Sequence, residues 1–432
     1  MSQNGAHVQK KKRSNAGRRK KTLKTVLIIL AVLLLAVGIG GYAVFHHLYG
    51  LMNTDANATP EPAPVSVTPA PSEEPDDSTP EPTDTPEPTP EPLTEEELQA
   101  LAELELRQSL EKDAEEILYN ENVYNILLIG ADGVKDTLER SDAMILLSIN
   151  RETKKIWVTS LMRDTQVTIP GWGTGHLNWA TSYGAGAPDA TRFDGVNLLI
   201  ATLESEKNFA IRIDNWALVN FLDFAEIANM LGPITVTVTA EEAVGMNALI
   251  RQVCQMRDKK LGIKKTNPTF RSLFPEEGGT LTITDGIQIL AYCRERKSAI
   301  GTSHYGDTGR SNKQREVLLM MWENVKKMNI FQQYELAEKV MSIVTTNLSE
   351  GKCATMLLSA PAFLEYEVIG QQCPHPGAMT KGRDANGLSA YFPDFRVNRN
   401  FLRATIYGEQ LSAYDLTSSW TGVPVLTYDP NA

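Results

Sequence analysis

A run of basic side chains between Tyr292 and Gln314 is the part of this sequence best suited to chemistry. This single stretch contains five cations: Arg294, Arg296, Lys297, Arg310 and Lys313. Guanidinium groups that converge from different elements bind phosphate or pyrophosphate through paired hydrogen bonds. A solvated basic surface would have the same composition. The sequence favours an anion site, because the cations come from two separate elements of an otherwise acidic protein.

The spacing of these residues predicts the elements that present them. Arg294 and Arg296 are two residues apart, so an extended strand would direct both side chains to one face. Arg310, Lys313 and Gln314 follow an i, i+3, i+4 pattern, which places them on one face of a helix. A glycine-containing loop joins the two segments. We therefore expect a strand and a helix to direct their cations at one anion.

The rest of the globular region alternates between strand and helix patterns. From Val123 onward, apolar runs such as VYNILLIGAD are followed by amphipathic stretches such as GVNLLIATLESE. This interleaving favours an α/β fold, with a mixed, largely parallel central sheet and helices on both faces. Ligands of such sheets bind beyond the carboxyl ends of the strands.

Charged residues fall at these predicted strand ends. Asp132 ends the first strand, Asp142 lies just before the second, and Arg163 with Asp164 ends the third. Taken singly, Asp132 and Asp142 are also typical of turns and caps. Two carboxylates beside arginines fit a Mg²⁺ ion that is shared with a diphosphate. No P-loop, dinucleotide fingerprint or His/Cys metal spacing competes with this interpretation.

The amino-terminal region predicts a membrane anchor. Residues 1–24 carry nine Lys/Arg and no acid, and the following apolar segment, 25–45, carries no charge. Its 21 residues would span roughly 31 Å as a helix, which matches a bilayer core. A cleaved signal peptide is the alternative, but its apolar region is usually shorter. The positive tail predicts a cytoplasmic amino terminus. We therefore expect the basic tail to bind anionic membrane lipid and not nucleic acid.

Composition divides the remainder of the chain. Residues 46–92 are rich in Pro, Glu and Thr and predict an extended extracytoplasmic stalk. Residues 93–119 predict a helical lead-in, which either packs on the next domain or forms a short coiled coil. A catalytic domain is expected over 120–410 and a tail over 411–432. A disulfide between Cys353 and Cys373 is compatible with this location.

Six ordered segments follow a recognisable pattern: NILLIGAD, ERSDAMILLSIN, SLMRDTQVTIPG, HLNWATSYGAG, IDNWALVNFLDFAEIANMLGPITV, and ITDGIQILAYCRERK followed by GDTGRSNKQ. Together, from about Asn125 to Gly408, they resemble the motifs of the LytR–CpsA–Psr (LCP) family of cell-wall glycopolymer transferases. The resemblance implies an αβα sandwich outside the membrane. It also implies phosphotransfer of a teichoic acid, capsular or related anionic glycopolymer from a polyprenyl-pyrophosphate carrier to peptidoglycan, with Mg²⁺.

The resemblance assigns roles to individual residues. Asp132 and Asp142 would hold Mg²⁺, and Asp164 would either orient Arg163 or act as the base for the acceptor hydroxyl. The implied pyrophosphate-binding residues are Arg140, Arg163, Arg294, Arg296, Arg310, Lys313 and Gln314. The helical stretches 197–203 and 221–231 would line a channel for the polyprenyl chain, or else belong to an ordinary core.

Three departures from the family pattern leave other functions open. Gly133 stands where an arginine is frequent, Lys313 replaces the second arginine of RxxRQ, and residues 232–234 read Gly-Pro-Ile in place of Gly-Gly-Val. A lysine is a point charge and lacks the bidentate fork of arginine. The alternatives are a non-catalytic regulator that binds a lipid pyrophosphate or a wall polymer, and a pyrophosphatase.

Overall fold

The computed structural model describes residues 46–47, 49–51, 53–54, 117–131, 141–186, 193–260, 262, 273–298, 306–418, 421–422 and 425. The predicted membrane segment, most of the stalk, residues 93–116, Asp132, Gly133 and Arg140 lie outside this set. No helix among the described residues is long and apolar enough to span a bilayer. The chain divides into Met1–Met52 and Asn53–Ala432, and the second unit contains the fold described below.

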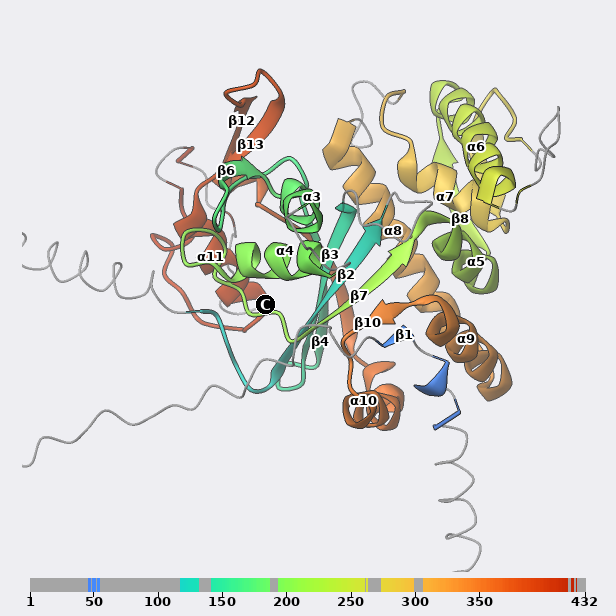
Figure 1. Cartoon of the computed structure of the whole chain (residues 1–432), viewed down its shortest axis with the longest axis horizontal. Coiled ribbons are helices and arrows are strands. Elements are labelled where there is room, and N and C mark those ends of the chain that lie inside the picture. The colour runs from blue at the N-terminus through green and yellow to red at the C-terminus, as the bar shows by residue number, and fades with distance from the viewer. Residues whose placement is uncertain are drawn as a thin grey trace, which may run out of the picture. The chain divides into compact units, whose positions relative to one another are not determined.

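A seven-stranded sheet forms the centre of this unit (Figure 1). Its strands lie in the order β1 (Asn53–Thr54), β10 (Thr345–Thr346), β7 (Asn215–Asn220), β2 (Val123–Ala131), β3 (Ser141–Asn150), β4 (Lys155–Leu161) and β11 (Glu367–Cys373). Three neighbouring pairs are parallel and three are antiparallel. The predicted mixed sheet is confirmed, whereas the expectation of a largely parallel sheet is wrong. The reason is that β2, β3 and β4 follow one another as an antiparallel meander.

Both boundaries of the predicted stalk and lead-in differ from expectation. Strand β1 lies inside the range predicted as stalk, yet it pairs in parallel with β10 at the sheet edge. Leu118, predicted to end the lead-in helix, instead forms a β-bridge with Ile211. Backbone pairing with the sheet region therefore extends into both segments: the extended chain at β1 gains a partner strand, and the helical pattern does not continue through Leu118.

Helices α3 (Trp179–Ala185), α4 (Asp194–Glu204) and α11 (Phe395–Thr405) lie on one side of the sheet (Figure 1). Helices α3 and α4 approach closely because residue 184 is glycine: a Cβ there would lie 2.3 Å from the carbonyl oxygen of Asp194. Leu199 and Leu203 of α4 are fully buried in the hydrophobic cluster beneath these helices. This burial is what an ordinary core requires, and the alternative, that residues 197–203 line a lipid channel, stays a prediction.

A second layer packs on the other side of the strands (Figure 1). It contains α5 (Phe221–Leu231), α6 (Ala240–Lys260), α7 (Gly286–Arg294), α8 (Gly306–Val325), α9 (Ile330–Ile343), α10 (Glu350–Phe363) and the ribbon of β8 (Ile234–Val238) and β9 (Gly279–Ile283). A Cβ at Gly286 would lie 1.8 Å from the carbonyl oxygen of Ala225, so only glycine permits this contact of α7 with α5. Pro233 lies in the turn between α5 and β8.

Two small hairpins lie beside the sheet and contribute to the site below. One joins β5 (Gln166–Ile169) to β6 (Gly173–His176), and the other joins β12 (Met379–Arg383) to β13 (Ser389–Pro393). A β-bridge between Thr165 and Tyr391 connects the second hairpin to the chain after β4. Leu416 and Val425 join the core cluster under α11, so the packed unit continues past residue 410.

The disulfide considered between Cys353 and Cys373 does not form. Cys353 lies within α10, whereas Cys373 ends β11 and is buried in the cluster on the α11 side. The two thiols are not joined to each other. Closeness in sequence misled the prediction, because a helix and a complete strand separate the two residues.

Candidate active site

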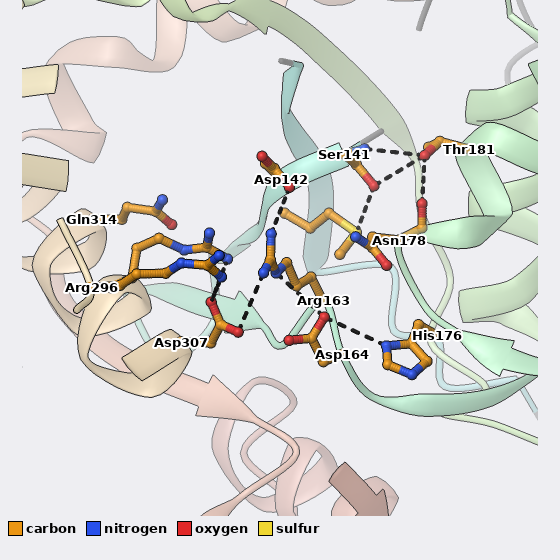
Figure 2. A network of polar contacts seen from close by, with 12 residues as sticks. Ser141, Asp142, Arg163, Asp164, His176, Asn178, Thr181, Arg296, Asp307 and Gln314 are labelled. Carbon is orange, nitrogen blue, oxygen red and sulfur yellow. Dashed lines mark hydrogen bonds and ion pairs between the residues drawn. The ribbon is translucent and has the colours of Figure 1, made fainter. Parts of the chain in front are cut away.

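Charged side chains from four segments meet where β3 begins and β4 ends (Figure 2). Asp142 is the second residue of β3, and Arg163 and Asp164 come after β4, separated from it by Met162. The antiparallel pairing of β3 with β4 brings the start of one strand beside the end of the other. Arg296 lies in the loop after α7, and Asp307 lies in the first turn of α8. Residues predicted from separate motifs are therefore neighbours in space.

Asp307 is the centre of this cluster. Its Oδ1 lies 3.1 Å from Nη1 of Arg296 and 3.1 Å from Nη2 of Arg310, and its Oδ2 lies 3.4 Å from Nη2 of Arg163. The backbone amide of Gly306 donates to the carbonyl of Arg296 at 2.9 Å, which ties the loop to the start of α8. Three guanidinium groups from three elements thus converge on one carboxylate.

Arg163 links Asp142, the carboxylate predicted to hold Mg²⁺, to the rest of the cluster. Its Nη1 donates to Oδ1 of Asp142 at 2.8 Å, and its Nε lies 3.4 Å from Oδ1 of Asp164. Burial alone would lower the pKa of Arg163, but the charges of Asp307, Asp164 and Asp142 outweigh burial and raise it. Arg163 therefore remains charged and is fixed from three directions.

Asp164 and Asp307 share a hydrogen bond and differ in protonation. Burial, reinforced by the hydrogen bond to Asp307, raises the pKa of Asp164 to about 6. Burial opposes ionisation of Asp307 as well, but the hydrogen bond from Asp164 and the charges of the three arginines lower its pKa far below the usual range. Asp307 is thus the permanent anion, and Asp164 is the carboxyl that exchanges a proton near neutrality.

His176, the last residue of β6, lies on the far side of Asp164 (Figure 2). Its Nδ1 is 3.5 Å from Oδ1 of Asp164, and its Nε2 is 3.2 Å from Oδ2 of Asp384. The imidazole stacks on Trp179, with ring centroids 4.5 Å apart and an angle of 13° between the planes.

A buried hydrogen-bond network fixes the start of β3. The backbone amide of Ser141 donates to Oγ1 of Thr181 on α3 at 3.1 Å, and that hydroxyl donates to the carbonyl of Asn178 at 2.9 Å (Figure 2). Ser141 and Thr181 are both fully buried. The position of Asp142 is therefore set by helix α3 as well as by the sheet.

Arg294 does not share a strand face with Arg296, so that prediction is wrong. Arg294 is the final residue of helix α7, and its guanidinium carbon lies 4.6 Å from the ring centroid of Phe221. The chain leaves the helix at Glu295, which reorients the side chain two positions later. Only Arg296 of this pair contacts Asp307.

Lys313 also lies elsewhere than predicted. The helix over Arg310, Lys313 and Gln314 is confirmed, but the lysine side chain is 0% exposed. Its Nζ lies 2.7 Å from Oε1 of Glu242 and 3.0 Å from Oε2 of Glu295. The expectation that Lys313 binds pyrophosphate is therefore wrong. Gln314 lies beside Arg296 in Figure 2, and its Nε2 donates to the carbonyl of Cys293 at 3.4 Å.

The carboxylate chemistry at the sheet edge fits a magnesium ion. Asp142 follows Ser141, whose partner in the antiparallel pair is Ala131 at the end of β2, and Asp132 follows Ala131 in sequence outside the described residues. No group of three or more His, Cys, Asp or Glu suited to a metal occurs among the residues that the structure describes. Mg²⁺ does not need such a group, because it commonly takes one or two carboxylates and completes its shell with phosphate and water.

Three residues of the site were given no role on the basis of the sequence: Asp307, which lies in the recognised segment GDTGRSNKQ, His176 and Asp384. Asp384 lies in the turn of the β12–β13 hairpin, where its Oδ1 accepts the amides of Asn386 and Leu388 at 2.9 and 2.7 Å. The Asn-Gly pair that follows marks a hairpin turn, so the turn itself was recognisable. The contact to His176 spans 208 positions, and no local pattern signals such a contact.

Comparison with known proteins places these features in one family. A family model described as the LytR_cpsA_psr family matches residues 96–401. A protein of Oceanobacillus iheyensis named polyisoprenyl-teichoic acid–peptidoglycan teichoic acid transferase TagU is 29% identical over 252 residues, which cover 57% of this chain and 66% of the relative. Biofilm regulatory protein A of Streptococcus mutans is 29% identical over 238 residues, covering 54% of this chain and 51% of the relative.

Solved structures support the same fold. The crystal structure of protein gbs0355 from Streptococcus agalactiae superimposes with a TM-score of 0.51 at 21% identity, covering 73% of this chain and 95% of that chain. The chain matches between half and two thirds of the length of the two curated relatives. The likeness to this structure therefore establishes the architecture alone.

Proposed function

This chain belongs to the LytR_cpsA_psr family, and we propose that it transfers an anionic glycopolymer from a polyprenyl-pyrophosphate carrier to peptidoglycan. The observation that carries this proposal is the convergence of Arg163, Arg296 and Arg310 on the single carboxylate of Asp307. The name of the similar TagU protein states the same class of reaction for that protein.

The arginine cluster suits a pyrophosphate for geometric reasons. Each guanidinium presents several N–H donors in a planar fork, and a phosphate oxygen accepts them as a carboxylate oxygen does. Arg163 and Arg310 are largely buried, whereas the side chain of Arg296 is 37% exposed. A diphosphate reaching the cluster from solvent would meet Arg296 first and would then bridge toward the two inner arginines.

We further propose that Asp142 holds Mg²⁺ together with Asp132. Bound there, the ion would neutralise charge on the phosphate oxygens. Arg163 keeps Asp142 in place through the contact at 2.8 Å. Arg140, the remaining arginine implied by the family pattern, precedes β3 by one residue and joins the phosphate-binding set in this proposal.

The reaction is an attack of an acceptor hydroxyl on the phosphorus that carries the glycopolymer. A new oxygen–phosphorus bond forms, the phosphoanhydride bond breaks, and polyprenyl phosphate leaves with the bond electrons. Negative charge accumulates on the phosphoryl oxygens, where preorganised arginines stabilise it. The hydroxyl proton passes to Asp164, whose pKa of about 6 suits it as a base near neutral pH.

The membrane end of the substrate requires an apolar surface. Helix α5 has five apolar side chains that are only partly buried: Phe221, Leu222, Phe224, Ile227 and Met230. We propose that this helix contacts the polyprenyl chain, and that the segment 25–45 anchors the protein with the amino terminus in the cytoplasm. Arg294, which covers the ring of Phe221, would then lie between the lipid and the phosphates.

The structure weakens one argument for a purely regulatory role. A lysine in place of the second arginine of RxxRQ would weaken an anion site only if it faced that site. Lys313 instead pairs with Glu242 and Glu295 in the interior. The described part of the arginine cluster is complete without it, which favours catalysis over binding alone.

One experiment separates the three candidate activities. The detergent-solubilised full chain is incubated with a radiolabelled lipid-linked glycopolymer, purified peptidoglycan and Mg²⁺. Label in the peptidoglycan fraction supports transfer. Retention of intact donor on the protein supports a binding module, and released polymer phosphate without incorporation supports a pyrophosphatase.

A matched pair of variants tests whether transfer depends on the arginine cluster. Arg310→Ala removes a buried cation 3.1 Å from Asp307. Arg403→Ala removes an arginine that pairs with Glu409 at 2.8 Å outside the cluster. Transfer should fall at least about 100-fold in the first variant and persist in the second. Equal activity in both would reject the assignment of the site.

A further inference from the structure

The imidazole of His176 is held on three sides. Its side chain is 4% exposed, and it lies between the carboxyl groups of Asp164 and Asp384, at 3.5 and 3.2 Å. The ring of Trp179 covers one face. A histidine fixed in this way keeps one orientation, and the groups at its two nitrogens decide which nitrogen carries the proton.

Asp384 determines that choice. Its Oδ1 already accepts two backbone amides of the hairpin turn, so its Oδ2 is directed at Nε2 of His176. Asp164 and Asp384 both present carboxyl oxygens, but only the contact of Nε2 with Asp384 at 3.2 Å is a hydrogen bond, so a singly protonated ring carries its proton on Nε2. The lone pair of Nδ1 then faces Asp164.

The neighbours of Asp164 restrict it from the other sides. Arg163 lies 3.4 Å from its Oδ1, Asp307 shares a hydrogen bond with its carboxyl group, and the backbone amide of Tyr391 donates to its carbonyl at 3.0 Å. The charged and titratable groups that face Asp164 and His176 are Arg163, Asp307, Asp384 and the phenol of Tyr391, whose pKa is raised by burial and by the charges of Asp307 and Asp164. None of the other elements packed there contributes a further described charge within ion-pair distance of either group.

We propose that His176, oriented by Asp384, is a positioning residue that holds Asp164 as the proton acceptor for the attacking hydroxyl. This inference rests on the proposed function. The proton of the acceptor hydroxyl moves to Asp164 as the oxygen–phosphorus bond forms. The newly protonated carboxyl has two hydrogen-bond acceptors beside it, the carboxylate of Asp307 and the lone pair of Nδ1, and the Nε2 proton stays with His176 beside Asp384.

Asp384→Asn is the most informative variant. The asparagine carbonyl can still accept the two backbone amides of the turn, so its NH2 group replaces the carboxylate oxygen that faces Nε2. The ring proton must then move to Nδ1, where it donates to Asp164. Such a donor stabilises the ionised carboxyl and lowers its pKa. The transfer kcat should fall about 10–100-fold, with the KM for donor unchanged and the acid limb of the pH–rate profile moved to lower pH.

A second histidine provides the control. His375 is half-buried, and its Nδ1 accepts the amide of Gly377 at 3.1 Å outside the cluster. Asn can accept the same hydrogen bond, so His375→Asn should leave kcat and the pH profile unchanged. An unchanged kcat and acid limb in Asp384→Asn, with wild-type transfer measurable, would overturn the positioning role.

The tautomer can be measured without any turnover. The chain has six histidines, so selective ¹⁵N labelling of histidine and His176→Asn together assign the relevant signal. The expected ring is Nε2-protonated in the full-length protein and Nδ1-protonated in Asp384→Asn. An Nδ1-protonated ring in the wild type would overturn the inference. If the wild type transfers no polymer, the proposed function fails, while the tautomer result still decides whether Asp384 orients His176.

Discussion

Replacing Lys313 by Met tests whether this lysine supports the fold or the anion site. Its Nζ is completely buried and lies 2.7 Å from Glu242 and 3.0 Å from Glu295. Removal of the cation leaves two carboxylates in the interior without their shared partner. Breaking a buried ion pair from one side costs about 3–5 kcal/mol of unfolding free energy. For a domain of this size, the melting temperature should fall by roughly 6–10 °C.

The same variant should alter the acid stability. Burial opposes ionisation of Glu295, but the hydrogen bond and charge of Lys313 lower its pKa. A lowered carboxyl pKa stabilises the fold above the unfolded value, and this contribution is lost as pH falls through the lowered folded value. The melting temperature of the wild type should therefore decline below about pH 4.5. In Lys313→Met the part of that decline due to Glu295 should disappear.

Thermal unfolding followed by circular dichroism measures both effects, with Lys339→Met as the control. Lys339 pairs with Glu226 on a more exposed surface, so its loss should change the unfolding free energy by less than about 1 kcal/mol. A Lys313→Met protein with unchanged melting temperature and weakened donor binding would refute the reasoning. That result would place the lysine in the phosphate site, as the sequence alone suggested.

Four further outcomes are expected. Arg296→Ala should lower kcat/KM for transfer at least about 100-fold, and Arg296→Lys should restore it only in part because the fork is lost; full activity of the alanine variant would remove Arg296 from the site. Asp142→Ala should abolish Mg²⁺-dependent transfer with little change in melting temperature, and a wild-type rate would leave Asp142 a purely structural role. Because the pKa of Asp164 is raised to about 6, kcat/KM should increase as pH rises through that value and Asp164→Asn should lack the increase; a flat wild-type profile would exclude Asp164 as base. Protease added to intact protoplasts should digest the globular domain and spare the amino-terminal tail, whereas a secreted form lacking residues 1–45 would contradict the anchor.

The elements of the fold were largely predictable because their signals are local. Apolar runs such as Val123–Ala131 become buried strands, and Asn220 and Asp285 cap the helices that follow them. The strand order was not predictable in the same way. The apolar sequences of β2 and β3 predict two buried strands in either case. They do not indicate whether the two strands pair antiparallel, as a hairpin, or parallel, through a crossover connection.

The site residues that lie in recognisable motifs could be predicted from the sequence. The surroundings of a side chain could not be predicted where they depend on how distant elements pack. Arg163, Asp142 and Asp307 belong to recognisable segments that the sheet brings together. Lys313 lies in the same helix segment as Arg310, but its partner Glu242 comes from α6. A helical repeat gives only the angular position of a side chain, and it cannot reveal whether the neighbouring surface is solvent, phosphate or a carboxylate from another helix.

The internal pairing of the arginine cluster has a consequence for how the donor is selected. Among the described residues of the cluster, three guanidinium groups face three carboxyl groups, so the local net charge is close to zero. Long-range attraction depends on net charge and is screened by salt, whereas contact geometry is not. The rate of donor association should therefore depend only weakly on ionic strength. A small monovalent anion cannot form hydrogen bonds with several guanidinium groups at once. The site should therefore select a diphosphate by short-range hydrogen-bond geometry and not by long-range electrostatic attraction.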